Sequence, residues 1–100
     1  MHDVIVMYNI PTDTAAFDAH YRDTHIPLVN ELPLLKEFTW GHVHRDEHDS
    51  GYYLIARLTY DSAEAAAESM ASPQGKKSVE DLANFASRGV TVLNVTRGDA

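Results

Sequence analysis

Residues 17–28 read Phe-Asp-Ala-His-Tyr-Arg-Asp-Thr-His-Ile-Pro-Leu. On a helix, the aromatic and aliphatic side chains of this segment share one face, and both histidines lie at its edge. Pro27 cannot donate a backbone hydrogen bond, and it disfavours helical angles at Ile26. The segment therefore predicts a helix that kinks or ends near His25, where the helix dipole favours a charged imidazole.

The segments on either side alternate between strand-like and helix-like patterns. Short β-branched or apolar runs predict strands over residues 3–9, 38–45, 52–60 and 90–95. The first helix is predicted to run from residue 12 or 13 to residue 25. The second is predicted over residues 61–71 and again from Ser72-Pro73 onward, with an apolar stripe of Val79, Leu82, Ala83 and Ala86. A polar stretch predicts a hairpin loop over residues 46–51.

The order β-α-β-β-α-β predicts a ferredoxin-like α+β sandwich with an antiparallel four-stranded sheet. We expect residues 1–100 to form one domain, because this length supports a single modest core. The strands over 3–9 and 52–60 are apolar on both faces, and helices cover one face of such a sheet. The second face therefore predicts a homodimer in which two copies pack sheet against sheet.

The composition excludes several classes of protein. A formal net charge of -7 argues against a nucleic-acid partner, which would need clustered Lys and Arg. The absence of cysteine excludes disulfides and thiolate catalysis. No apolar run approaches the ~20 residues of a membrane span, and no basic segment followed by an apolar stretch marks a signal peptide. We expect a cytoplasmic protein.

Several motifs resemble the EthD family of dimeric α/β-barrel proteins, over nearly the whole chain. The more specific are Phe17-x-x-His20-Tyr21-x-x-x-His25-x-Pro27-Leu28 and the turn Ser72-Pro73-Gln74-Gly75. Weaker matches are Leu32-Pro33-x-Leu35, Tyr60-Asp61-Ser62-x-Glu64-Ala65 and Asp81-Leu82-x-Asn84-Phe85. Gln74 stands where the family often has an acidic residue, in a turn whose role looks structural.

The resemblance implies two sheets packed face to face across a two-fold axis, in agreement with the apolar strand faces. The family is associated with ether degradation in bacteria, and related fungal sequences with polyketide decarboxylation or dehydration. The wider superfamily holds cofactor-free monooxygenases, lactone isomerases, polyketide cyclases and haem enzymes. A shared fold does not choose among these activities.

Three residues of the opening segment are candidates for catalysis. His25 matches the family's most recognisable position and suits a general acid or base acting on a small organic substrate. The alternative is a histidine that only bonds a carbonyl at the helix end. Tyr21 lies one turn earlier, where it could orient the imidazole or donate to a substrate oxygen, or be a core tyrosine. His20 is the third candidate, and it faces either the cleft or solvent.

The candidate substrate-binding residues are Phe17, Trp40, Tyr8 and His42, which would line a pocket or fill the core. His42 and His44 share one strand face and form half of a metal site. No cysteine or suitably spaced carboxylate supplies a third ligand, and haem would need a larger pocket. We expect no metal and no bound cofactor.

These residues favour a small cofactor-independent protein in which His25 moves a proton on an apolar, aromatic or polyketide-like substrate. Lyase, isomerase and oxygenase outcomes can all begin with that step, in catabolism or secondary metabolism. The alternative is a non-catalytic dimer that binds a small apolar ligand or serves as an accessory in a degradation pathway.

Overall fold

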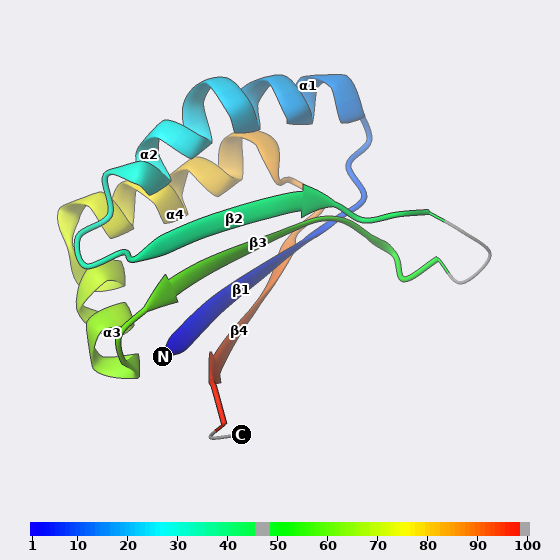
Figure 1. The fold of residues 1–100 in the computed structure, drawn as a ribbon. Coiled ribbons are helices and arrows are strands. Elements are labelled where there is room, and N and C mark those ends of the chain that lie inside the picture. The colour runs from blue at the N-terminus through cyan, green and yellow to red at the C-terminus, as the bar shows by residue number, and fades with distance from the viewer. Residues whose placement is uncertain (46–48, 99–100) are drawn as a thin grey trace.

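The sheet has four antiparallel strands in the order β2-β3-β1-β4, in a computed structural model that describes residues 1–45 and 49–98 (Figure 1). The strands are β1 His2–Asn9, β2 Glu37–His42, β3 Tyr52–Tyr60 and β4 Val90–Thr96. The predicted ferredoxin-like fold is confirmed. β2 ends three residues earlier than predicted, and residues 46–48 of the predicted loop lie outside the described residues.

The first helical run does not end at His25, so that alternative was wrong, but the regular α-helix is interrupted there. α1 Thr14–His20 continues into a π-helical turn, η1 Tyr21–His25, and then into α2 Ile26–Asn30. In the π turn the Ile26 N–H bonds the Tyr21 carbonyl, five residues back. A regular α-helix would bring the Pro27 ring against the Asp23 carbonyl. The wider turn accommodates the proline, and Ile26 keeps helical angles.

The second helix is broken in two, as predicted, into α3 Ala63–Ala71 and α4 Pro73–Phe85. Ser72 lies between them, and its Oγ accepts a hydrogen bond from the Gly75 N–H at 3.0 Å. The predicted apolar stripe of α4 is confirmed only in part, because Leu82 and Ala86 pack against the core but Val79 and Ala83 are exposed. The buried positions are Gly75, Ser78, Asp81 and Phe85, whereas Val79 is 55% exposed. Small and polar residues face inward because α4 packs closely on α3 at one end and supplies Asp81 to the interior.

Gly75 allows that close packing, and its replacement tests it. A Cβ at this position would lie closer than 3.0 Å to the backbone carbonyl oxygens of Ser69 and Met70. We expect Gly75→Ala to lower the free energy of unfolding by about 1–3 kcal/mol, despite the higher helix propensity of alanine. Thermal unfolding at fixed protein concentration measures this.

The control is Gly98→Ala, because a Cβ at Gly98 meets no heavy atom within 4 Å. Its free energy of unfolding should change by less than about 0.5 kcal/mol. Equal stability of the two alanine variants would contradict the packing argument.

The helices α1, α2 and α4 lie on one face of the sheet, and α3 lies at its end, after β3 (Figure 1). Between them and the sheet an aromatic cluster surrounds Tyr8 of β1. Its ring centroid lies 5.4 Å from that of Phe17, 5.7 Å from that of Tyr21 and 5.6 Å from that of Phe85. These contacts fix α1, η1 and α4 against β1 and so determine where η1 and α4 present their polar side chains.

The opposite face of the sheet is uncovered and largely apolar, with Arg57 of β3 opposite Ile5 of β1. Its large apolar side chains on β1, β3 and β4 are Ile5, Met7, Ile55, Leu93 and Val95, of which the last three are 38%, 44% and 40% exposed. We call these five residues the outer-face patch. No helix of the described chain covers it.

A charged group borders the outer-face patch. Asp3 accepts hydrogen bonds from the Arg97 Nε–H at 2.9 Å and from the Thr59 hydroxyl at 2.6 Å. These bonds, above all the one from Arg97, hold the pKa of Asp3 at about 2. The carboxylate is therefore already paired within its own chain and does not oppose packing of the patch against another apolar surface.

Candidate functional site

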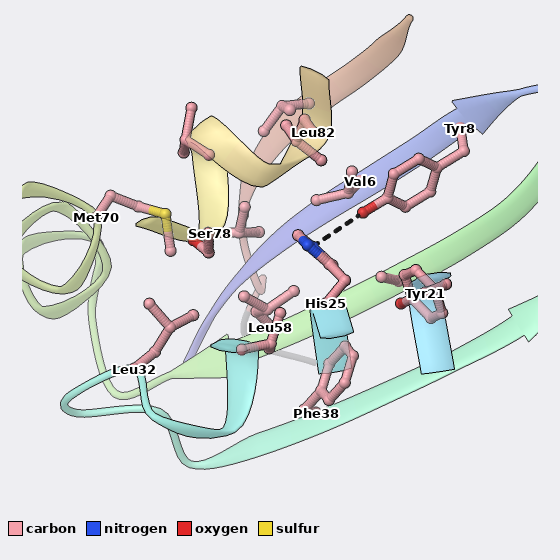
Figure 2. A pocket seen from close by; sticks show the side chains of 15 residues that line it. Val6, Tyr8, Tyr21, His25, Leu32, Phe38, Leu58, Met70, Ser78 and Leu82 are labelled. Carbon is pink, nitrogen blue, oxygen red and sulfur yellow. Dashed lines mark hydrogen bonds between the residues drawn. The ribbon is translucent and has the colours of Figure 1, made fainter. Parts of the chain in front are cut away.

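A cavity of about 110 Å³ lies between the sheet and the helices, as Figure 2 shows. Its walls come from all four strands and from η1, α2, α3 and α4. Most of the lining is aliphatic or aromatic: Val4, Val6, Val29, Leu32, Phe38, Ala56, Leu58, Met70, Val79, Leu82 and Val92. Its polar groups come from Tyr8, Tyr21, His25 and Ser78. Since Ser78 donates its hydroxyl to the Gly75 carbonyl, the two tyrosines and the histidine are the polar side chains that could meet a ligand.

His25 is buried, and each ring nitrogen has a distinct neighbour. Nδ1 lies 2.9 Å from Asp81 Oδ2, and Nε2 lies 3.4 Å from the Tyr8 hydroxyl oxygen (Figure 2). An ionised carboxylate only accepts hydrogen bonds, so Nδ1 carries the proton and Nε2 has the free lone pair. The contact with Tyr8 is long for a hydrogen bond, so a ligand in the cavity can replace it.

Burial lowers the pKa of His25, and the hydrogen bond and charge of Asp81 oppose that effect only in part. The imidazole is therefore neutral at pH 7 and can accept a proton at Nε2. Asp81 stabilises the imidazolium once it forms. This is the environment of a general base.

Asp81 is held by three donors. His20 Nε2 lies 2.8 Å from Oδ1, the Asn84 side-chain amide 3.0 Å from Oδ1, and His25 Nδ1 2.9 Å from Oδ2. Burial alone would raise the pKa of Asp81, but the hydrogen bonds from Asn84 and the two histidines outweigh it and lower that pKa. Asp81 is therefore a carboxylate that fixes the tautomer and orientation of His25.

Tyr21 supplies the second polar group of the cavity. Its side chain is 1% exposed, and its hydroxyl has no hydrogen-bond partner among the described residues. Burial raises the pKa of Tyr21, so the hydroxyl keeps its proton. A buried donor without a partner costs free energy, which a ligand oxygen in the cavity would recover.

Comparison with known proteins finds a matching family model and a relative of similar length. The family model for the EthD domain matches residues 10–89. The chain belongs to the EthD family. An uncharacterized 11.0 kDa protein encoded in the thcB-thcC intergenic region of Rhodococcus erythropolis is 43% identical, over 93% of this chain and 91% of the relative.

Solved structures agree with the EthD assignment. An EthD family protein from Bacillus halodurans is 30% identical with a TM-score of 0.91, covering 98% of this chain and 99% of the other. Two further structures share the fold, each with 17% identity and a TM-score of 0.73. One is a hydroxynitrile lyase from Passiflora edulis, and the match covers 99% of this chain and 95% of the other. The second is a dimeric ferredoxin-like protein from Jannaschia, and the match covers 97% of this chain and 100% of the other.

In this EthD chain three of the predicted site residues line the cavity and four lie outside it. His25, Tyr21 and Tyr8 line the cavity. Phe17 and His20 lie instead along a second depression, between the start of α1 and the end of α4. Trp40 is 39% exposed and packs against Tyr21 from outside the cavity. His42 is exposed and pairs with Asp18 at 3.0 Å, also away from the cavity.

The possible metal site on β2 gains no third ligand. His42 bonds Asp18, and no group of three His, Asp or Glu side chains suited to a metal ion exists in residues 1–45 and 49–98. Within the same residues no helix is long and apolar enough to cross a membrane.

Asp81 was not predicted as a functional residue. It lies in one of the weaker EthD motifs, Asp81-Leu82-x-Asn84-Phe85, but no role was attached to it. The signal that could have found it is its position three residues after Ser78 and four before Phe85, on one face of α4. A carboxylate on a buried helix face needs a partner, and a histidine is a suitable one.

Proposed function

We propose that this EthD protein binds a small, largely apolar molecule in the cavity and moves a proton on it, with His25 as general base. The observation that carries the proposal is the presence, in one apolar cavity, of an acceptor with only one long hydrogen bond and of a donor without a partner. These are the Nε2 lone pair of a histidine fixed by buried Asp81, and the unpartnered hydroxyl of Tyr21.

The two groups have complementary roles. Nε2 of His25 takes a proton from the bound molecule, and Asp81 stabilises the resulting imidazolium. The Tyr21 hydroxyl donates to the oxygen on which negative charge develops. Proton abstraction of this kind can lead to lyase, isomerase or oxygenase outcomes. Of these, the lyase type appears in the name of one structural relative, the hydroxynitrile lyase from Passiflora edulis.

The cavity limits the size of the molecule. An apolar cavity of about 150 Å³ holds benzene, so a cavity of about 110 Å³ suits a compact molecule of roughly one small ring. Val79 and Val92 line the cavity yet are 55% and 49% exposed, which places its opening between α4 and β4. An aromatic or polyketide-like substrate would place one ring inside and extend the remainder through that opening.

The outer-face patch supports the second part of the proposal, which is a homodimer joined through that face of the sheet. The patch is apolar, and the charged side chains beside it are Arg57 and an Asp3 carboxylate that is paired within its own chain. Structural relatives include a dimeric ferredoxin-like protein. Joining two copies by this face leaves the cavity of each on the opposite, helical side of its sheet.

A ligand pair of matched shape tests the role of Tyr21. Cyclopentanone and methylenecyclopentane differ in one oxygen, and backbone amide shifts in NMR titrations report their binding. We expect Tyr21→Phe to weaken binding of the ketone about tenfold, the value of one hydrogen bond, and to leave binding of the hydrocarbon unchanged.

Tyr53→Phe is the control, because the Tyr53 hydroxyl bonds Asp18 outside the cavity. If both variants lose the same affinity for the ketone, the Tyr21 hydroxyl is not the group that bonds the ketone oxygen. Binding without proton exchange at the ketone α-carbon in D₂O would instead favour the alternative, a ligand-binding protein without catalysis.

A further inference from the structure

Asp81 is shared by two histidines that differ in their access to water. Its Oδ1 lies 2.8 Å from His20 Nε2, and its Oδ2 lies 2.9 Å from His25 Nδ1. The side chain of His20 is 27% exposed, whereas those of His25 and Asp81 are each 6% exposed. His20 lines the outer depression, and His25 lines the inner cavity. The carboxylate therefore links a solvent-exposed imidazole to a buried one.

The surroundings of this group contain few other titratable side chains. His25 faces the Tyr8 hydroxyl from β1, the Tyr21 ring from η1, and Asp81 and Phe85 from α4. His20 faces Asp81 and stacks on Phe85, and Asn84 adds an uncharged amide. Among these contacts the Asp81 carboxylate is the one anion, and the two side chains that can become cations beside it are His20 and His25.

We propose that His20 is a positioning residue that binds the available proton ahead of His25, so that His25 stays neutral with its Nε2 lone pair in the cavity. The role of His25 as the base is taken from the proposed function. The order in which the two histidines bind protons is a separate property, and it can be measured without any substrate.

The physical reason is that one carboxylate compensates one positive charge. The first proton goes to the imidazole that keeps contact with water, because a buried imidazolium loses hydration. A second proton on His25 would then place two cations on one carboxylate, at an energetic cost. In addition to burial, the charge of His20 lowers the pKa of His25.

A purely structural role would need only a hydrogen-bond donor at position 20 to hold the Asp81 carboxylate. Glutamine supplies such a donor without a charge, and arginine supplies one with a permanent charge. The two substitutions therefore separate a charge effect from a hydrogen-bond effect.

The experiment follows the ¹³Cε1 and ¹Hε1 signals of each histidine by NMR from pH 4 to pH 8, in the full chain without ligand. In the wild type we expect His20 to titrate at higher pH than His25. In His20→Gln the His25 midpoint should move to higher pH, whereas in His20→Arg it should stay at the wild-type value or fall. His42→Gln, which removes an exposed histidine paired with Asp18, should leave His25 unchanged.

Three results would overturn the proposal: a His25 that binds its proton before His20 in the wild type, an unmoved His25 midpoint in His20→Gln, or equal upward movement in the Gln and Arg variants. The wild-type order decides the question even if a variant does not fold. If the wild type shows the expected order of titration but does not exchange the α-protons of the ketone, the proposed function is wrong and this inference stands.

Discussion

His25→Asn is expected to lower the rate of α-proton exchange of cyclopentanone by roughly 10²- to 10⁴-fold, which is the usual contribution of a general base. The asparagine amide can still donate to Asp81 in place of Nδ1, so the buried carboxylate keeps a partner. Nε2, the atom with the free lone pair, is lost. Proton NMR in D₂O measures the exchange directly.

The pH dependence of the wild-type rate follows from the same group. Burial places the pKa of His25 below its ordinary value, and the neutral form is the active base. Activity should therefore persist into mildly acidic solution and fall only as the pH drops through that lowered pKa. An unperturbed histidine would lose activity at higher pH.

His42→Gln serves as the control for the exchange measurement, because His42 is exposed and lies outside the cavity. Its exchange rate should equal that of the wild type. If His25→Asn binds the ketone and exchanges its protons as fast as the wild type, His25 is not the base. If the wild type binds the ketone without exchange, the protein is a binder of small molecules.

Leu93→Lys is expected to convert the proposed homodimer into an 11.1 kDa monomer at micromolar concentration. Leu93 pairs with Ile5 in the register of β1 and β4, within the outer-face patch. In a two-fold dimer each copy would bury a lysine, and the combined cost of desolvation and like-charge repulsion should be about 3–4 kcal/mol. That raises the dissociation constant roughly 10²- to 10³-fold.

Sedimentation velocity checks this prediction, with Val79→Lys as the matched variant. Val79 is as apolar and as exposed as Leu93, but it lies on α4, on the helical side of the sheet. The Val79 variant should remain dimeric. A monomeric wild type would contradict the proposed dimer, and monomers of both variants would point to a general loss of stability.

The strands could be predicted because each apolar or alternating run in the sequence ends close to residues that favour a turn or a helix cap. β3 has the predicted bounds, since its apolar run is closed by a polar loop on one side and a helix cap on the other. For β2 the alternation placed Trp40 and His42 on one face of the strand, which in the structure is the helical face. It did not predict their exposure, because β2 is an edge strand and the helices do not extend over that part of it.

The helices were predicted less well because their orientation depends on long-range packing. The apolar positions of α4 predicted a face containing Val79, but the junction with α3 turns Gly75 inward and brings Asp81 to His25. Local pattern and the EthD resemblance made His25 and Tyr21 candidates, but they missed Asp81, the partner of His25 on a helix more than fifty residues away. No short-range rule connects the two segments.

The π turn at Tyr21–His25 makes the direction of the imidazole depend on how the backbone turns there, and not only on which side chains line the cavity. Such a turn takes in one residue more than an α-helical turn, and each residue rotates a helix by about 100°. A substitution of Pro27 that permits an unbroken α-helix of the same length would therefore point the imidazole about a quarter of a turn away from the Asp81 carboxylate. Deletion of one residue between Tyr21 and His25 would compensate for that rotation. Relatives without the proline are therefore expected to keep the chemistry of the site only where the chain is also one residue shorter at this point.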